Sequence, residues 1–525
     1  MKRRTLMQAG LAALAAPALA QPARTIRFVP HASLAVLDPV ASSAYVTRNH
    51  GFLVWDTLYG IDAQYRAQPQ MVAGHGVEDG GLRWTFTLRE GLRFHDGEPV
   101  RAADCVASIR RWGARDAMGG RVLALAEEIA ALDDRRFAIR LRRPFAMLAD
   151  ALAKPGSIAC FVMPERIASA DPMRPFGPGE VVGSGPFRFR ADEFVLGARV
   201  VYERFDGYVP RAEGEASFTA GPKRVLVDRV EWQIIPDPAT AAAALRAGEV
   251  AWWERTTADL HPMLARERDV VVTIPDTLGF IATFRPNHLQ PPFDNPRLRR
   301  ALLPAVNQAD FGAAIAGTDA RFWRTGVGVF APGTPLATEA GLEAMRFDLD
   351  RARRLVAESG YAGEPVVLLA ATDVPATAAM SEVGADMLRK AGLTVDYQTM
   401  DWASVVRRLG SREPPARGGW SGYFSSWAGL DHINPAGHLL LRGNGSAGFI
   451  GWPESPRIEA LREAWFEATS LEEQRRIAAD LQRQAMEDVP YIPLGQYFLP
   501  MAHRRTLSGA MQPGGIPLFW GVSIG

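Results

Sequence analysis

Residues 84–99, WTFTLREGLRFHDGEP, carry the clearest structural pattern in the chain. Trp84, Phe86 and Leu88 alternate with polar residues, which is the period of a strand that is buried on one face. Each of the two glycines that follow comes after an acidic residue, a pairing that is typical of turns. The stretch therefore predicts a half-buried strand followed by a turn.

The residues after this stretch repeat the strand pattern and place a helix between the two strands. Phe137, Ile139 and Leu141 form the second alternating run. Between the two runs, the apolar residues that share one helical face are Cys105, Val106, Ile109 and Trp112. Strand and helix signals alternate in this way along the whole chain, which predicts mixed α/β domains.

The N-terminus has the pattern of a secretory signal peptide. Basic residues at positions 2 to 4 precede the apolar run 10–19, and small residues surround a predicted cleavage site after Ala20. Arg3 and Arg4 are compatible with both the general secretory and the twin-arginine routes. The apolar run is shorter than the roughly 20 residues of a membrane helix. Neither cysteine lies near the cleavage site, so we expect an exported, lipid-free protein in the periplasm.

The bulk composition limits the possible partners. With 59 basic and 58 acidic residues, the chain has no charge excess that would attract nucleic acid or an anionic membrane. Its 525 residues exceed what one hydrophobic core normally serves, so two or three domains are expected. Cys105 and Cys160 both lie in apolar segments. A disulfide between them is open in this compartment, but the context favours two buried thiols.

Six segments support a resemblance to a known family. They are Trp84–Pro99, Ala103–Asp104, Gly183–Phe187, Leu245–Glu249, Pro291–Asp294 and Val489–Leu494. Taken together, they resemble the family 5 extracellular solute-binding proteins, which include dipeptide-, oligopeptide- and nickel-binding components of ABC importers. The segments follow the family's order and span essentially the whole mature chain.

This resemblance implies an α/β fold, the two-lobed periplasmic-binding-protein clamshell of type II, cluster C, with an extra inserted subdomain. The implied boundaries are 1–20 for the signal peptide, 21–60, 183–274 and 496–525 for the discontinuous lobe I, 61–182 for the inserted subdomain, and 275–495 for lobe II. Hinges near Pro275 and Leu494 would let the lobes close on a ligand and exclude water.

The function that the resemblance implies is capture of a peptide-like or amine-bearing solute and its delivery to the permease subunits of an ABC importer. The chain would act as a monomer, use no cofactor or metal, and catalyse no reaction. The sequence contains no nucleophile elbow, phosphate loop or redox cysteine pair. Two alternatives stay open, a periplasmic hydrolase and a binder of a metal complex. For the metal complex His432 is a candidate, although it and His438 lack partners at metal spacing.

Residues 427–435, WAGLDHINP, resemble the family segment in which a tryptophan precedes an aspartate that binds the ligand's amino group. Trp427 would supply an apolar wall, and Asp431 would supply the carboxylate for the ammonium. One extra residue, Leu430, separates the two relative to the family's pattern. The alternative is that Asp431 only caps a turn before the Asn-Pro pair that follows.

Two further segments match the family's pocket. Trp402 aligns with a second aromatic residue of that pocket, although packing at a strand-to-helix junction is an equal alternative. Ser43, Ala44 and Tyr45 match an early segment that hydrogen-bonds the ligand through main-chain groups. We therefore expect these four residues to line the cleft.

The sequence departs from the family at the arginine that clamps a peptide carboxylate. By spacing, the two positions where it is expected fall near Ala371 and Phe424, and neither is basic. Asp373 lies beside the first position, and aromatic residues surround the second. Without a guanidinium, a buried carboxylate lacks its bidentate partner. We therefore expect Asp373 and Phe424 to line a cleft for a cationic or neutral ligand, or for a longer peptide held elsewhere.

Overall fold

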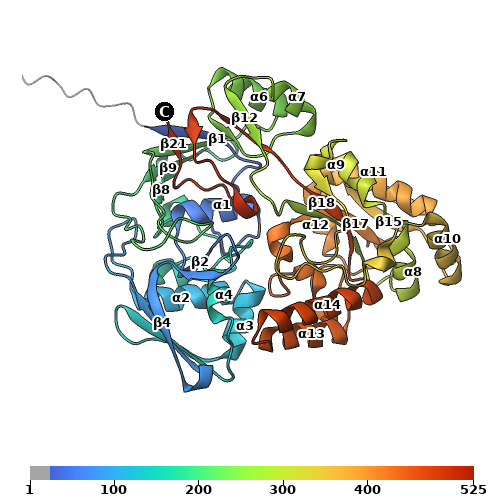
Figure 1. Cartoon of the computed structure of the whole chain (residues 1–525), viewed down its shortest axis with the longest axis horizontal. Helices are drawn as coiled ribbons and strands as arrows, with labels where there is room; N and C mark the ends of the chain where they lie inside the picture. Colours follow the sequence, from blue (N-terminus) through green and yellow to red (C-terminus); the bar gives the residue numbers. More distant parts are fainter. Residues whose placement is uncertain (1–23) are drawn as a thin grey trace, which may run out of the picture.

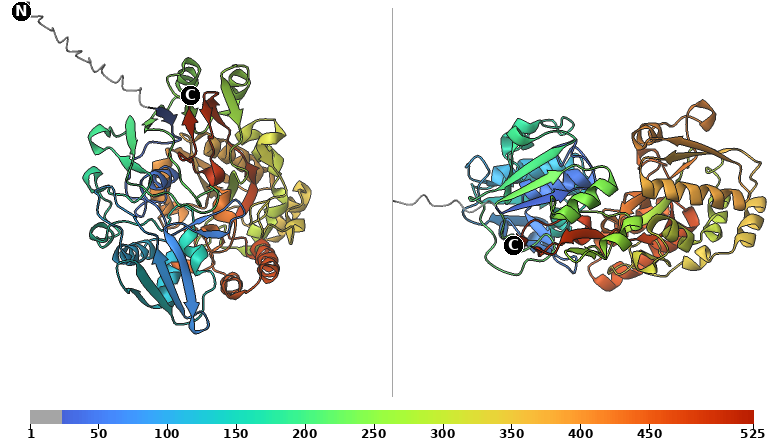
Figure 2. Two further views of the ribbon diagram at one scale, coloured as in Figure 1. Left: turned by 60° about the vertical axis from the view of Figure 1, so that its left-hand side comes forward. Right: turned by 90° about the horizontal axis from the view of Figure 1, so that it is seen from above.

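The computed structural model describes residues 24–525, so the predicted signal peptide lies outside the described residues. The chain forms two lobes that lie side by side, and β1 and the C-terminus both belong to the first lobe (Figures 1 and 2). Each lobe is built around its own mixed β-sheet. In this described part of the chain, no helix is both long and apolar enough to cross a membrane.

Lobe I contains a seven-stranded sheet with the strand order β12-β19-β11-β1-β10-β9-β8. Its strands are β1 (Thr25–Val29), β8 (Phe187–Phe189), β9 (Arg199–Arg204), β10 (Arg229–Gln233), β11 (Trp252–Trp253), β12 (Val270–Thr273) and β19 (Met501–Arg504). Its helices are α1 (Tyr45–Val54), α6 (Pro238–Ala247) and α7 (His261–Leu264). A short pair, β20 (Leu507–Ser508) and β21 (Ser523–Ile524), follows. Because the late strand β19 pairs between β11 and β12, this lobe is discontinuous in sequence.

The inserted subdomain contains a four-stranded antiparallel sheet with the order β4-β5-β7-β6. Its strands are β4 (Val72–Glu78), β5 (Arg83–Leu88), β6 (Ala126–Ala131) and β7 (Arg136–Leu141), after a hairpin of β2 (Tyr59–Ile61) and β3 (Ala67–Pro69). Its helices are α2 (Ala102–Gly113), α3 (Ala117–Leu125), α4 (Leu148–Ala153) and α5 (Glu165–Ala168). Trp84, Phe86 and Leu88 are buried along β5, which confirms the predicted strand. Cys105 and Cys160 are buried free thiols.

The turn after β5 is held by His95, which is almost fully buried. Its Nδ1 accepts from the N–H of Gly183 at 3.2 Å, so Nε2 donates to the carbonyl oxygen of Gly185 at 3.0 Å. A Cβ at Gly183 would lie 1.8 Å from the carbonyl oxygen of Val54, so only glycine permits this approach. The polar turn thus satisfies backbone groups where the chain re-enters lobe I.

Lobe II contains a six-stranded sheet with the order β14-β18-β13-β17-β15-β16. Its strands are β13 (Phe280–Pro286), β14 (Trp323–Arg324), β15 (Val366–Ala371), β16 (Val395–Met400), β17 (Gly422–Ala428) and β18 (Ile492–Tyr497). Its helices are α8 (Pro296–Ala301), α9 (Gln308–Ala316), α10 (Leu349–Glu358), α11 (Pro375–Lys390), α12 (Trp402–Leu409), α13 (Pro456–Glu467) and α14 (Leu471–Asp488). At the start of α14, the side chain of Ser470 caps the helix by accepting the N–H of Glu473.

The chain crosses between the two large sheets twice. Residues 274–279 join β12 to β13, and residues 498–500 join β18 to β19. Pro275, one predicted hinge, lies in the first crossing. Leu494, the other, lies inside β18, because that strand continues to Tyr497 before the chain leaves lobe II. Two short crossings are compatible with a rigid-body motion of one lobe relative to the other.

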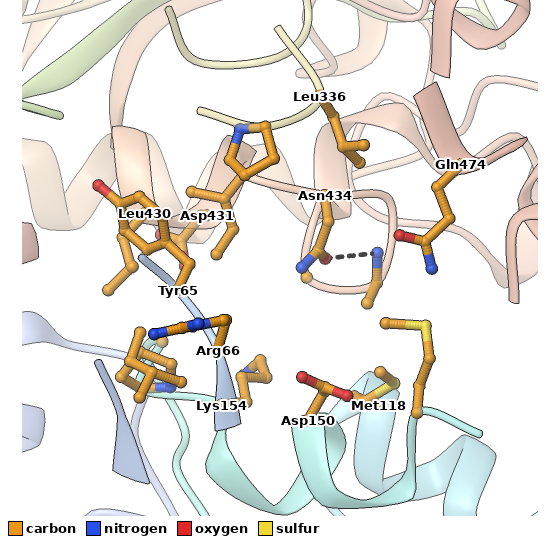
Figure 3. A pocket seen from close by; sticks show the side chains of 18 of the residues that line it. Tyr65, Arg66, Met118, Asp150, Lys154, Leu336, Leu430, Asp431, Asn434 and Gln474 are labelled. Carbon is orange, nitrogen blue, oxygen red and sulfur yellow. Dashed lines mark hydrogen bonds between the residues drawn. The ribbon is translucent and has the colours of Figure 1, made fainter. Parts of the chain in front are cut away.

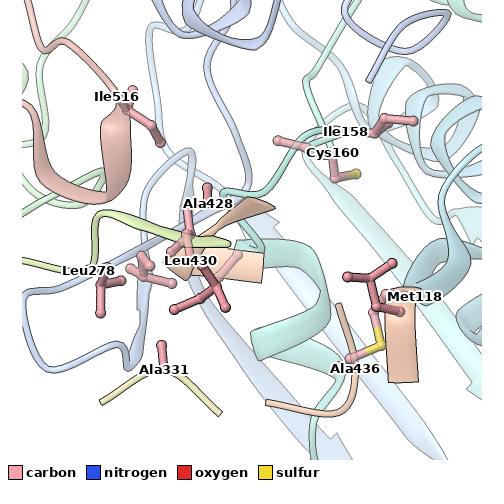
Figure 4. Packing of buried hydrophobic residues seen from close by; sticks show 14 of the residues in the cluster. Met118, Ile158, Cys160, Leu278, Ala331, Ala428, Leu430, Ala436 and Ile516 are labelled. Carbon is pink, nitrogen blue, oxygen red and sulfur yellow. The ribbon is translucent and has the colours of Figure 1, made fainter. Parts of the chain in front are cut away.

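Apolar packing continues from lobe I into lobe II beside these crossings (Figure 4). Leu430, Leu278 and Ile516 are all buried there. The Cδ2 atom of Leu430 lies 3.1 Å from the position that a Cβ would take at Gly514. Leu430, the extra residue relative to the family's pattern, therefore packs at the contact between the two lobes.

Candidate ligand-binding site

Asp431 lies where β17 leaves the sheet of lobe II. The strand ends at Ala428 and continues into the 3-10 turn η9 (Gly429–His432). At Gly429 a Cβ would lie 2.2 Å from the carbonyl oxygen of Leu278, so glycine allows the turn to pass close to the first crossing. The carboxylate that follows is directed toward lobe I, and Asp431 is only 8% exposed.

The hydroxyl group of Tyr45 connects Asp431 to lobe I. Tyr45 is the first residue of α1, and its hydroxyl donates to Asp431 Oδ2 at 2.6 Å. The hydroxyl oxygen of Tyr45 in turn accepts from the backbone N–H of Ala428 at 3.0 Å. One side chain of lobe I is thus bonded to both the end of β17 and the turn that follows it.

Burial determines the protonation behaviour of this pair. Removal from water raises the pKa of Asp431, and the charge of Asp116 adds to the effect. The hydrogen bond from Tyr45 and the charges of Lys154 and Arg48 act in the opposite direction. Burial also raises the pKa of Tyr45 well above its ordinary range, so its hydroxyl remains a donor. A buried carboxylate of this kind is stabilised when a cationic group takes the place of its lost hydration.

Cations and aromatic rings alternate around the same contact between the lobes. The guanidinium carbon of Arg48 lies 4.8 Å from the ring centre of Tyr45, and that of Arg255 lies 4.8 Å from the ring centre of Phe280. The two rings meet edge to face at 6.4 Å. Because Phe280 belongs to β13 of lobe II and the other three belong to lobe I, this stack stabilises the contact between the lobes.

A cavity of about 450 Å³ opens beside Asp431, between the inserted subdomain and lobe II (Figure 3). Asp431 and Asn434 line it from lobe II, and Lys154 and Asp150 line it from the subdomain. Its apolar lining includes Met118, Met147, Leu336, Ile433, Trp465 and Leu471. Mostly apolar walls with a few converging polar groups are typical of sites for small molecules.

Lys154 brings a positive charge into this cavity. Its ammonium donates to Asp116 Oδ2 at 2.7 Å and to the carbonyl oxygen of Ile158 at 3.1 Å. Asp116 is the N-cap of α3 and also accepts from the N–H groups of Met118 and Gly119. An ammonium has three N–H donors, so that of Lys154 can serve one further acceptor.

Three other predicted residues, which are close to Tyr45 or Asp431 in the sequence, are not among the residues that line this cavity. Ser43 and Ala44 precede α1 and are exposed. Trp427 is half-buried, and its ring meets that of Phe449 edge to face at 5.4 Å. The main-chain role of Ser43 and Ala44, and the wall role of Trp427, stay predictions.

The remaining predicted residues form a separate group in lobe II. Asp373 is exposed and accepts the backbone N–H of Trp402, the first residue of α12, at 2.8 Å. The side chain of Trp402 packs against a small apolar cluster that includes Tyr423. Phe424 is 1% exposed and lies 4.8 Å from the ring of Phe284. The ring of Phe424 therefore packs in the hydrophobic core of lobe II.

The two histidines that follow Asp431 are packed inside lobe II. The rings of His432 and His438 lie 4.2 Å apart, and burial lowers the pKa of His432 to about 4. His438 contacts the carbonyl oxygen of Val329 and the hydroxyl of Tyr491. Within residues 24–525, no three or more His, Cys, Asp or Glu side chains form a group that could hold a metal ion.

Sequence reasoning missed the side of the cavity that the subdomain provides. Lys154 and Gly156 stand in the apolar segment 148–160, which has the composition of a core segment. The available signal was a lysine directly before a Pro-Gly pair in that segment. Gln474 was also missed, because its place in the first turn of α14 is typical of a surface residue.

Two α/β lobes joined by two crossings, with a buried carboxylate and a cavity beside their contact, are the features of a two-lobed binding protein. The chain belongs to the bacterial extracellular solute-binding proteins of family 5, whose middle-region model matches residues 66–440. Members of this family are binding proteins of transport systems that act in the periplasm or outside the cell. The match confirms the family that the sequence segments indicated.

Similar proteins cover nearly the whole chain. A protein of Sinorhizobium fredii named a probable peptide ABC transporter periplasmic-binding protein is 37% identical over 99% of both chains. The glutathione-binding protein of Salmonella typhi is 25% identical over 94% of this chain and 92% of its own.

Solved structures confirm the predicted two-lobed α/β fold. The dipeptide-binding protein of Pseudoalteromonas sp. SM9913, in complex with Met-Leu, superposes with a TM-score of 0.79 at 18% identity, over 96% of this chain and 100% of its own. The binding protein AgaA of A. tumefaciens R10, in complex with agropinic acid, gives a TM-score of 0.77 at 20% identity, over 95% and 99%.

Proposed function

We propose that this protein is the periplasmic binding component of an ABC importer for a peptide-like, amine-bearing solute. The solute is enclosed between the lobes with its ammonium against Asp431, and it is then delivered to the permease subunits in the inner membrane. Export would remove residues 1–20, and the mature chain would act as a monomer. The relative from Sinorhizobium fredii, by its name a peptide transporter component, supports the peptide-like ligand.

The observation that carries this proposal is the buried carboxylate of Asp431 at the edge of the cavity. One of its oxygens is bonded by Tyr45, and its charge is only partly compensated by the cations around it. In a region with little water, attraction between an ammonium and a carboxylate is several times stronger than in solution. A ligand with a free amine is therefore preferred over one whose amine is neutral and blocked.

Binding without chemistry is the simplest role for these residues. The polar side chains of the cavity include Asp431, Asn434 and Lys154. They are suited to holding a charged solute. A hydrolase of the same compartment would cleave a bound peptide, whereas a binding protein would release it intact. If the protein instead bound a metal complex, it would have affinity for the chelate but not for the peptide alone.

The test compares di- and tripeptides in two forms, with the amino terminus free or acetylated, by calorimetric titration against the full mature chain. Free peptides should bind, and their acetylated forms should bind at least thirtyfold more weakly, which corresponds to about 2 kcal/mol. Equal affinity for both forms would contradict the proposal. Mass spectrometry of the peptide recovered after overnight incubation should show the intact mass, and cleavage products would favour the hydrolase.

A further inference from the structure

Gly156 lies beside the two charged groups that face each other in the cavity. It is buried, and a Cβ at this position would lie 3.2 Å from Asp431 Oδ1 and 3.3 Å from Lys154 Nζ. All three residues line the same cavity, with Lys154 and Asp431 on opposite sides (Figure 3). The point next to Gly156 is therefore within contact distance of a carboxylate oxygen and of an ammonium nitrogen at once.

The charged side chains around this position alternate in sign. Asp116 is bonded to Lys154, whose positive charge in turn acts on Asp431. A ligand group that places an ammonium toward Asp431 and a carboxylate toward Lys154 continues this alternation. Such a group is a zwitterion, so it compensates both protein charges and adds no net charge to a buried region.

The short distance between Asp431 and Lys154 limits how far apart the two charges of the ligand can be. In an extended dipeptide with the ordinary α-linkage, the amino and carboxyl ends are roughly 7 Å apart. Asp431 Oδ1 and Lys154 Nζ lie 3.2 Å and 3.3 Å from the same position beside Gly156, so they are at most 6.5 Å apart, a separation that suits an ammonium and a carboxylate carried by the same carbon atom. The rest of the ligand would then extend along the apolar wall toward Met118 and Met147.

We propose that Lys154 is the carboxylate-binding residue of this protein, and that the solute carries a free α-amino-acid group joined to the rest of the molecule through its side chain, as in a γ-glutamyl peptide. This inference rests on the proposed function, because it needs the ammonium at Asp431. A carboxylate site at Lys154 also explains why the arginine expected from the family is absent near Ala371 and Phe424. The carboxylate is bound from the inserted subdomain, so lobe II needs no arginine there.

The test uses two isomeric dipeptides, γ-L-glutamylglycine and α-L-glutamylglycine, titrated against the full mature chain. Only the γ-isomer carries its ammonium and a carboxylate on one carbon, so it should bind at least tenfold more tightly. Lys154→Met should remove this preference, and Lys154→Arg should restore most of it. Arg66→Met is the matched control, because Arg66 lines the same cavity but is 68% exposed and paired with Asp62.

A second pair of variants leaves every charged group in place. Gly156→Ala puts a methyl group at the shared point and should weaken binding of the γ-isomer at least tenfold. Gly437→Ala adds a methyl group to the same cavity, 3.8 Å from Lys154 Cε, and should change the affinity less than twofold. Neither glycine has a positive φ, so alanine fits both backbones. This pair decides the question even if Lys154→Met fails to fold.

The outcomes separate the two proposals. Equal affinity for the isomers, tighter binding of the α-isomer, or full affinity in Gly156→Ala would overturn the role of Lys154. If free-amine peptides still bind better than acetylated ones in that case, the role of Asp431 stands. If free and acetylated peptides bind alike, the proposed function fails, and the inference fails with it.

Discussion

Asp431 and Asp373 are both aspartates near a tryptophan in lobe II, but the fold gives them opposite environments. Asp431 is 8% exposed and is bonded by Tyr45 from the other lobe. Asp373 is exposed, and its carboxylate accepts the backbone N–H of Trp402. A carboxylate in water gains little when a ligand ammonium replaces its hydration, whereas a buried one gains much more. Burial, more than residue type, is therefore what makes Asp431 the stronger candidate for binding a ligand ammonium.

The largest expected effect is the difference between Asp431→Asn and Asp373→Asn. Loss of one partner from a buried charge pair costs about 2–5 kcal/mol, so the first variant should bind a free-amine peptide roughly thirtyfold to several thousandfold more weakly. The second should bind within twofold of the wild type. Calorimetric titration with the same peptide measures both affinities.

The stability of the unliganded variants provides the control for this comparison. The raised pKa of Asp431 means that its ionised form is disfavoured in the folded protein, so Asp431→Asn should melt at the same or a higher temperature. If Asp431 were only a turn cap, the free energy of unfolding would fall by about 1 kcal/mol and the affinity would be unchanged.

Tyr45→Phe tests whether the contact across the lobes contributes to binding. The variant loses the bond to Asp431 and leaves the N–H of Ala428 without this acceptor, which should weaken affinity about tenfold to a hundredfold. Tyr361→Phe is the matched control, because that hydroxyl also donates one bond and accepts one, to the carbonyl of Glu364 and from a backbone N–H. An equal loss of affinity in both variants would show a general effect on folding.

The pH dependence of binding tests the ionisation of Asp431. Burial raises its pKa, Tyr45, Lys154 and Arg48 lower it, and Asp116 raises it further, with a net upward shift. Binding of an ammonium needs the ionised carboxylate, so affinity should fall as the pH falls through this raised pKa, by up to about tenfold per pH unit. Titrations between pH 7 and pH 4 should show this loss in the wild type. In Asp431→Asn the residual affinity should not depend on pH in this way.

The smallest expected effect concerns Asp373→Ala. This change removes the acceptor for the N–H of Trp402 at the start of α12, so the free energy of unfolding should fall by about 1 kcal/mol. The affinity for a free-amine peptide should stay within twofold. A loss of affinity larger than tenfold in a well-folded variant would place Asp373 in the binding site and remove the contrast with Asp431.

The local sequence pattern predicted the strands and helices in which buried residues recur at a fixed interval. Trp84, Phe86 and Leu88 indicated β5 because each side chain faces the same core, and the apolar face of α2 was predicted in the same way. Phe424 was assigned to the cleft from spacing alone, but in β17 a shift of one residue moves a side chain to the opposite face of the sheet. The hinge near Leu494 was likewise placed inside a strand that continues to Tyr497.

The sequence by itself determined the family and the mixed α/β character and singled out Asp431 as a candidate binding residue, because these depend on local period and on segments that keep their order along the chain. Only the tertiary structure showed that Tyr45, Lys154 and Gly156 converge on that carboxylate. These residues belong to three separate parts of the chain, and no local pattern couples them. Their distances are fixed by how the lobes and the subdomain pack, and that packing depends on apolar surface buried between segments far apart in sequence.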